Sequence, residues 1–88
     1  MNRQQEIRSL VRNGLYYLTE HADEEAMNDG IDIYDIEYCL LSGTIQQSWP
    51  DEAKYEIVGV SIDGRAIGVV CRITSGSKVR IITVYEIG

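Results

Sequence analysis

The chain has 88 residues and carries eight Lys and Arg against fourteen Asp and Glu, so its formal net charge is −6. This length suits one domain with one core, which we expect to span residues 1–88. The acidic total excludes a polybasic nucleic-acid binder, and 44% hydrophobic residues with a single Pro exclude a disordered tail. No apolar run reaches membrane-spanning length and the N-terminus lacks a signal-peptide segment, so we expect a cytoplasmic protein with no membrane partner.

The two cysteines, Cys39 and Cys71, lie far apart and form no CxxC pair. This spacing excludes a zinc knuckle or a thioredoxin motif and favours two small buried thiols. His21 is the only histidine, so we expect neither a metal site nor another cofactor.

The charges are unevenly distributed along the chain. Residues 20–37 contain eight acids and no Lys or Arg, whereas residues 54–85 contain five bases and two acids. A negative total therefore leaves room for a positive face. Two solvated surfaces of opposite sign would explain the same pattern without any function.

In chain order, three helices are expected first. Apolar side chains at helical spacing predict a helix over residues 4–12. Residues 15–18 are a short apolar run, which indicates a strand or extended segment. Thr19 fits the N-cap of a second helix over residues 20–28, which Asp29-Gly30 ends.

The third helix is expected over residues 33–42. Asp32 fits its N-cap, and Gly43 fits the position after its last turn. Its predicted buried side chains are Ile33, Ile36 and Leu40.

From Thr44 the apolar pattern has a period of two, which is typical of strands. A strand over residues 44–49 is followed by strands over 55–62 and 65–74, and Asp63-Gly64 between them is a strong signal for a two-residue hairpin turn. A last strand, 78–86, follows the turn at residues 75–77. The expected fold is α+β: a three- to four-stranded antiparallel meander in residues 44–88, with two to three helices from residues 1–43 on one face.

The two turns set the expected strand register. A two-residue turn pairs Tyr55 with Arg72, and a three-residue turn pairs Arg72 with Arg80, so these three side chains form one row outside the core. Thr83 and Tyr85 are expected to continue the core face. That core face contains Val58, Val60, Ile62, Ile67, Val69, Cys71, Ile73, Val79 and Ile81.

Two interpretations of the predicted row remain open. Arg suits bidentate phosphate contact and Tyr offers a stacking plane, so the row fits a phosphate or RNA site. The alternative is two solvated arginines that pair with Glu56 or Glu86. His21 and Glu25, at i, i+4 on a helix, likewise fit either an oriented base or a local hydrogen bond.

A series of short motifs runs through the chain: Leu18-x-x-His21-Ala22, Met27 with Gly30-Ile31, Asp35-Ile36-Glu37, Leu40–Gly43, Pro50-Asp51, Gly59, Asp63-Gly64-Arg65, Val69-Val70 and Ile82-Thr83-Val84-Tyr85-Glu86. Each motif alone is weak, but their order and spacing together are fairly specific. From about Gln4 onward, the chain resembles the small family DUF4258, a domain of unknown function.

Members of this family are often encoded beside a YgiT-type zinc-finger protein of the MqsA antitoxin kind. The resemblance therefore implies a type II toxin related to MqsR and, more distantly, to the RelE and BrnT ribonuclease toxins. It implies a RelE- or MqsR-like fold, an mRNA substrate and a YgiT-type antitoxin as partner, and it leaves a homo-oligomer open. Such toxins cut mRNA without a metal, through attack of the 2′-hydroxyl on the neighbouring phosphate.

This cleavage needs a base for the 2′-hydroxyl and cations for the phosphorane. The resemblance implies that His21 or Tyr85 moves protons and that Arg65 holds the phosphate, with all three at one end of the sheet. The residues expected to bind the RNA backbone are Lys54, Tyr55, Arg72 and Arg80.

One position departs from the family pattern. Many relatives have a His after the Gly-Arg turn, in a pattern such as Arg-Pro-Leu-His-Val-Val, whereas this chain has Gly68. If that His is catalytic in relatives, this chain is a weak or inactive enzyme. The alternative function is a non-catalytic protein-interaction or RNA-binding module.

Overall fold

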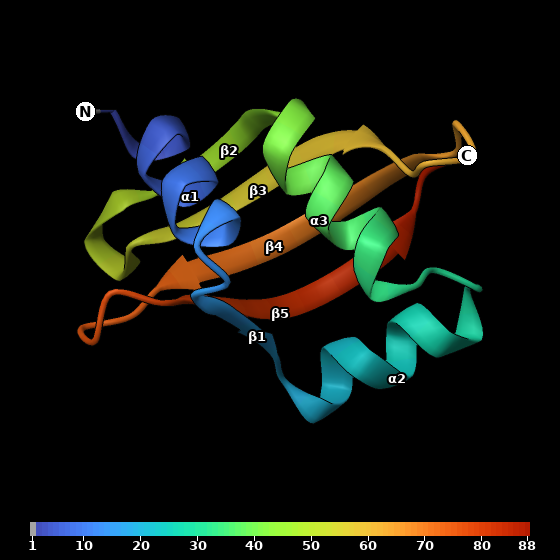
Figure 1. Cartoon of the computed structure of the whole chain (residues 1–88), viewed down its shortest axis with the longest axis horizontal. Coiled ribbons are helices and arrows are strands. Elements are labelled where there is room, and N and C mark those ends of the chain that lie inside the picture. Colours follow the sequence, from blue (N-terminus) through green and yellow to red (C-terminus); the bar gives the residue numbers. More distant parts are fainter. Residues whose placement is uncertain (1) are drawn as a thin grey trace.

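The computed structural model describes residues 2–88, which form three helices and a five-stranded sheet (Figure 1). In chain order the elements are α1 (Arg3–Arg12), β1 (Tyr16–Leu18), α2 (Glu20–Asn28), α3 (Ile33–Ser42), β2 (Thr44–Trp49), the short 3-10 helix η1 (Pro50–Glu52), β3 (Lys54–Val60), β4 (Ala66–Ile73) and β5 (Val79–Glu86). The expected α+β class, with helices before the long strands, is confirmed.

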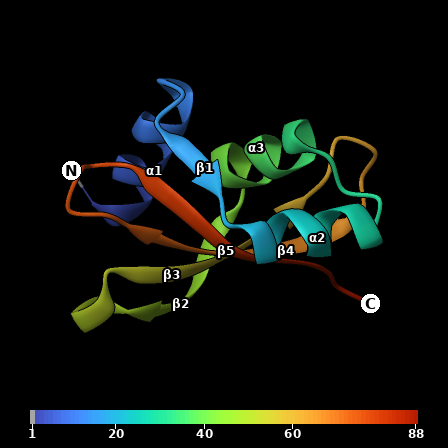
Figure 2. The same ribbon diagram turned by 90° about the horizontal axis from the view of Figure 1, so that it is seen from below.

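The strand order in the sheet is β1-β5-β4-β3-β2. Strands β2 to β5 form the expected antiparallel meander, and β1 adds a fifth strand that runs parallel to β5. The sheet is therefore mixed, and β1 lies within residues 15–18, where a strand or extended segment was predicted, although its pairing with the meander was not. Helices α1 and α3 lie on one side of the sheet, α2 runs along its β5 edge beyond the end of β1, and no helix of residues 2–88 covers the other side (Figure 1 and Figure 2). We call this uncovered side the open face.

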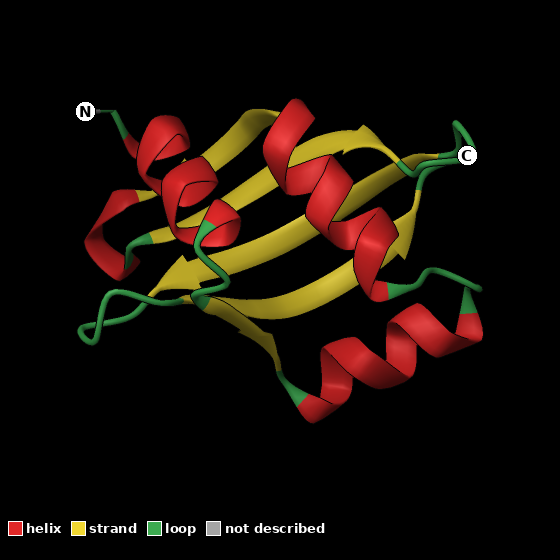
Figure 3. Ribbon diagram, in the orientation of Figure 1, coloured by secondary structure: helices red, strands yellow, loops and turns green. Residues whose placement is uncertain are grey.

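Side-chain caps explain why the predicted helix boundaries agree with the structure to within one residue. Thr19 accepts a hydrogen bond from the Ala22 amide at 3.1 Å. Asp32 and Asp35 form a reciprocal capping box at the start of α3. These caps bind amide groups that have no partner inside the helix, so each helix begins at a defined residue (Figure 3).

The core lies between the helices and the sheet. Its most buried side chains are Ile7, Val11, Ile36, Cys39, Leu40, Ile57, Ile67, Val69, Cys71, Val79, Ile81 and Val84. Ile33 was expected there but is 38% exposed, and Cys39 takes its place on the buried side of α3. Both cysteines are free and buried, as predicted. Burial raises the pKa of the Cys39 thiol to about 11.

The predicted register between β3 and β4 is wrong by one residue. The turn contains three residues, 62–64, because the Ser61 amide donates to the Arg65 carbonyl and Gly64 adopts a positive φ of 87°. Tyr55 therefore pairs with Cys71, and Lys54 pairs with Arg72. This shift turns every β3 side chain to the other face of the sheet.

The core face of β3 is the less apolar of its two faces, because small residues there let α3 pack closely against the strand. Gly59 faces α3, and a Cβ there would lie 3.0 Å from the Gly43 Cα. Ser61 is buried as well, and its hydroxyl accepts a hydrogen bond from the Arg65 amide. The end of α3 therefore packs close to the strand, while Val60 and Ile62 are exposed.

Gly43 has a different role from the one predicted. Its φ is −80°, so it does not adopt the left-handed conformation that often ends a helix. A glycine is needed instead because a Cβ would lie 2.6 Å from the Val58 carbonyl oxygen.

A bulge in β5 changes the expected face of its last residues. Val70 pairs with Thr83 but Cys71 pairs with Ile81, so Ile82 is an additional residue in β5. Val84 therefore points into the core, and Tyr85 lies on the open face. No helix of residues 2–88 is long and apolar enough to cross a membrane.

We expect Gly43→Ala to lower the free energy of unfolding by about 1–3 kcal/mol, because the new methyl group meets two backbone carbonyls that cannot move independently. Urea denaturation measures this change. Gly76→Ala is the matched control, because the nearest atom to its Cβ is the Thr74 Oγ1 at 3.9 Å. Equal stability of the two variants would contradict the close approach of α3 to β3.

Candidate functional site

One row of side chains crosses all five strands on the open face. Tyr17 on β1 pairs with Arg80 on β5, which pairs with Arg72 on β4. Arg72 pairs with Lys54 on β3, which pairs with Trp49 on β2. We call these five residues the cationic row, because three adjacent cations are flanked by one aromatic ring at each end.

The cations of the row are only partly neutralised. The Lys54 ammonium lies 4.7 Å from the centre of the Trp49 ring, a cation–π contact. The Arg72 Nη2 lies 3.1 Å from a carboxylate oxygen of Glu52, and its Nε has no hydrogen-bond partner in residues 2–88. Arg80 is exposed and forms no ion pair with any described residue.

Two arginines directly opposite each other repel, so the Arg72–Arg80 pair costs stability. Glu52 offsets the charge of Arg72, and no residue within 2–88 forms an ion pair with Arg80. An anion between the two guanidinium groups would remove this repulsion. The arrangement therefore suits a phosphate-bearing ligand.

A hydrogen-bonded pair of ionisable groups lies beside the cationic row. The Tyr85 hydroxyl donates to a Glu56 carboxylate oxygen at 2.5 Å. The Tyr85 ring lies over Gly68 and occupies the space that any side chain at position 68 would need. Glu56 is two residues from Lys54 on the same strand face, about 7 Å away. The pair thus places a proton acceptor and a proton donor next to three cations.

The hydrogen bond to the Glu56 carboxylate, with burial, raises the pKa of Tyr85 to about 12. The phenol is therefore protonated at neutral pH. Since its pKa is higher in the folded state, this bond adds stability that is complete below the ordinary value of 10.0 and is lost as the pH rises toward 12. Tyr16 behaves in the same way, because its hydroxyl donates to Glu37 at 2.7 Å.

The predicted phosphate-binding residues separate into two groups. Arg72 and Arg80 pair as predicted, and Lys54 joins them. Tyr55 is not in the row, because the shifted register buries it on the opposite face with 3% exposure.

Arg65 lies on the helix-covered side of the molecule. Its guanidinium donates to the Asp29 and Gly30 carbonyl oxygens at 2.8 Å and 2.7 Å, and it also contacts the carboxylates of Asp63 and Glu86. These bonds fasten the α2–α3 loop to the hairpin and to the end of β5. Arg65 and Tyr85 are therefore not in contact, although both lie near this end of the sheet.

His21 is exposed on α2, with 68% of its side chain accessible. Its Nε2 lies 3.4 Å from a carboxylate oxygen of Glu25, which confirms the predicted i, i+4 contact. No hydrogen bond or ion pair within residues 2–88 joins His21 to Arg65 or Tyr85. The structure therefore does not bring the three predicted catalytic residues together.

Several acids of the segment 20–37 have structural roles. Glu25 accepts a hydrogen bond from the Val84 amide and Asp29 from the Glu86 amide, along the part of β5 that extends beyond β1. These carboxylates bind amides that a neighbouring strand would otherwise bind. The dense negative charge in this segment thus closes a sheet edge.

Glu56, Trp49 and Tyr17 were missed as site residues. Glu56 was expected only as an ion-pair partner of the arginines. Its position on the open face follows from the three-residue β3–β4 turn, whereas Asp63-Gly64 predicted a two-residue turn. Trp49 and Tyr17 enter the row through β2 and β1. Among residues 2–88, no group of three or more His, Cys, Asp or Glu side chains lies close enough to hold a metal ion.

The model of the family described as a domain of unknown function (DUF4258) matches residues 18–86. The chain belongs to the DUF4258 family. The match begins at the end of β1, so it includes the helices α2 and α3 and the four long strands, while α1 precedes it. No curated protein and no solved structure shows a significant match.

We expect Glu56→Gln to lower the pKa of Tyr85 from about 12 toward 10.0, because the substitution removes the negative charge that favours the protonated phenol. The ζ-carbon shifts of labelled tyrosines, followed by NMR in an alkaline titration, measure this change.

Tyr16 is the internal control, because its partner Glu37 is unchanged and its pKa of about 12 should persist in the variant. A Tyr85 pKa that does not respond to the substitution would contradict the hydrogen bond across the open face.

Proposed function

We propose that the open face binds single-stranded RNA and that this DUF4258 chain is a metal-independent endoribonuclease, the toxin of a type II toxin–antitoxin pair. The observation that carries the proposal is the cationic row, in which three cations lie between two aromatic rings. The family membership and the Glu56–Tyr85 pair support it further.

The row has the two components that bind a single strand. Lys54, Arg72 and Arg80 lie on adjacent strands about 5 Å apart, so one RNA backbone can contact more than one of them. Tyr17 and Trp49 offer ring faces on which bases stack regardless of sequence. The net charge of −6 does not oppose this proposal, since eight of the fourteen acids fall in residues 20–37, whose helices lie at the β5 edge and on the covered side of the sheet.

The Glu56–Tyr85 pair supplies the proton transfers. In the proposed reaction, the Glu56 carboxylate takes the 2′-hydroxyl proton, and the 2′-oxygen bonds to phosphorus as the bond to the 5′-oxygen breaks. Tyr85 gives its proton to the departing 5′-oxygen and regains one from Glu56 through their hydrogen bond. Arg72 and Lys54 stabilise the phosphorane. The products are a 2′,3′-cyclic phosphate and a 5′-hydroxyl.

His21 and Arg65 remain predicted participants. His21 has an exposed ring on α2, where it would act as a second proton carrier. Arg65 reaches a phosphate only if it leaves the two carbonyl oxygens that it now binds, so Glu56 and Tyr85 are tested first.

A toxin of this type needs a partner that holds it inactive. We propose a YgiT-type zinc-finger antitoxin for this role and cellular mRNA as the substrate. Both would meet the chain in the cytoplasm.

We expect the purified protein to cut a labelled single-stranded RNA in the presence of EDTA and to leave 2′,3′-cyclic phosphate ends. Glu56→Gln and Tyr85→Phe should each lower the rate at least 100-fold, because acid–base groups contribute about 10²–10⁴ to such reactions. Arg80→Gln should lower it about 10-fold through weaker phosphate binding. Gel electrophoresis and mass spectrometry of the ends measure these effects.

Arg12→Gln is the matched control, because Arg12 is an exposed arginine on α1, away from the open face, and its loss changes the net charge equally. Expression in cells adds a second readout, since the wild-type chain should arrest growth and Glu56→Gln should not. RNA binding without cleavage would contradict the enzyme and leave an RNA-binding module. Cleavage unaffected by both Glu56→Gln and Tyr85→Phe would contradict the assigned chemistry.

A further inference from the structure

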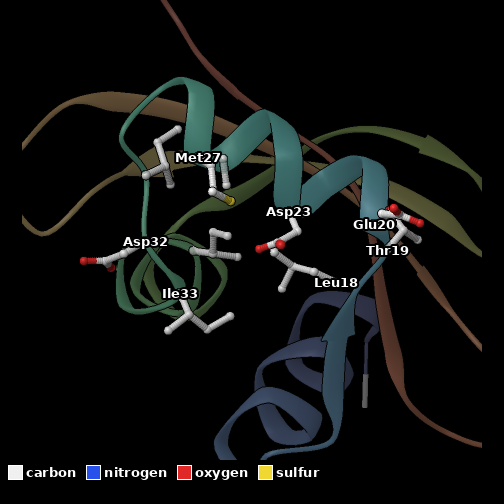
Figure 4. A pocket seen from close by; sticks show the side chains of 10 residues that line it. Leu18, Thr19, Glu20, Asp23, Met27, Asp32 and Ile33 are labelled. Atoms are coloured by element: carbon white, nitrogen blue, oxygen red, sulfur yellow. The ribbon is translucent and has the colours of Figure 1, made fainter.

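A pocket of about 540 Å³ opens between α2 and α3, on the helix-covered side of the sheet (Figure 4). Its apolar wall consists of Leu18, Ala26, Met27, Ile31, Ile33 and Ile36. Thr19 and three carboxylates, those of Glu20, Asp23 and Asp32, complete the lining, and no Lys, Arg or His is part of it. We call this pocket the α2–α3 groove.

The groove exposes apolar surface that the fold itself does not cover. Met27 is 73% exposed, the highest value among the large hydrophobic residues of the described chain, and Ile33 on the facing helix is 38% exposed. The Met27 sulfur and the Asp23 carboxylate point toward the space between the two helices (Figure 4). Apolar exposure next to acidic groups is typical of a protein-binding surface.

We propose that the α2–α3 groove binds a basic amphipathic helix of a partner protein. Two helices form its walls, which is the setting in which a third helix places apolar side chains at i, i+3 or i+4 and i+7. Strand addition does not fit this side of the molecule, because Glu25 and Asp29 already bind the edge amides of β5. Because every charged residue of the lining is acidic, the occupant needs Lys or Arg beside its apolar side chains.

A second copy of this chain does not meet these requirements. Its α1 is the only helix with more Lys and Arg than Asp and Glu among the three described, and α1 buries Ile7 and Val11 in its own core. Its α2 and α3 are acidic and would repel an acidic groove. The occupant is therefore a different protein.

A displayed library of helical peptides tests this proposal on the full chain. The library fixes apolar residues at i, i+3, i+4 and i+7 and lets the flanking positions take Lys, Arg, Asp, Glu or Ser. We expect the selected peptides to be rich in Lys and Arg. Added to ¹⁵N-labelled protein, they should shift the NMR signals of α2 and α3 and leave those of the open face unchanged.

Variants of the α2–α3 groove test whether a selected peptide binds there. Asp23→Lys and Met27→Glu should each weaken binding of a selected peptide at least 10-fold, because one reverses the charge of the lining and the other places a carboxylate on its apolar wall. Ile62→Glu is the matched control, since Ile62 is also a largely exposed apolar residue, on the β3–β4 turn, and the variant should bind unchanged. Circular dichroism checks that each variant is folded.

Three outcomes would overturn the proposal. They are selected peptides without excess positive charge, peptide shifts mapped outside α2 and α3, and a dimer of the chain alone that Met27→Glu dissociates. Each of these results leaves the RNA proposal unaffected, because that proposal rests on the opposite side of the sheet.

Discussion

The contact between Gly43 and Gly59 determines which way β3 faces. With no side chain on either residue, the end of α3 lies against the strand, and a Cβ on Gly59 would lie 3.0 Å from the Gly43 Cα. The two glycines fix Gly59 on the covered side, so Tyr55 and Ile57 point into the core by alternation. Lys54 and Glu56 must then lie on the open face.

This orientation creates the candidate site. Lys54 lies beside Arg72, and Glu56 comes within reach of the Tyr85 hydroxyl. Tyr85 itself depends on Gly68, because its ring lies where any other side chain at that position would be. If β3 faced the other way, it would place Tyr55 on the open face instead of Lys54 and Glu56.

The two sides of the sheet have separate electrostatic roles. Acids of α2 and α3 cap helices and bind the edge amides of β5, while Arg65 ties the α2–α3 loop to the β3–β4 turn. The open face carries the cations that these contacts do not use. A chain with an acidic total can therefore present a positive surface, and the α2–α3 groove can attract a partner of opposite charge.

Local signals in the sequence were enough for the helices, because Thr19 and Asp32 are caps whose effect does not depend on distant residues. The pairing of Arg72 with Arg80 followed in the same way from the short turn between β4 and β5. The β3–β4 register could not be predicted in this way, because Asp63-Gly64 fits turns of two or three residues and packing on α3 decides between them. The bulge at Ile82 and the parallel β1 pairing likewise depend on tertiary contacts, and for this reason Glu56 and Tyr17 were missed.

The most direct test of the account is NMR mapping of a single-stranded RNA on the ¹⁵N-labelled protein, with 2′-O-methyl sugars to prevent cleavage. The account predicts shifts of the Trp49 indole signal and of the Arg72 and Arg80 side chains, with amide changes along the open face of the sheet. Shifts confined to α1, α2 and α3, or no shift at low salt, would contradict it.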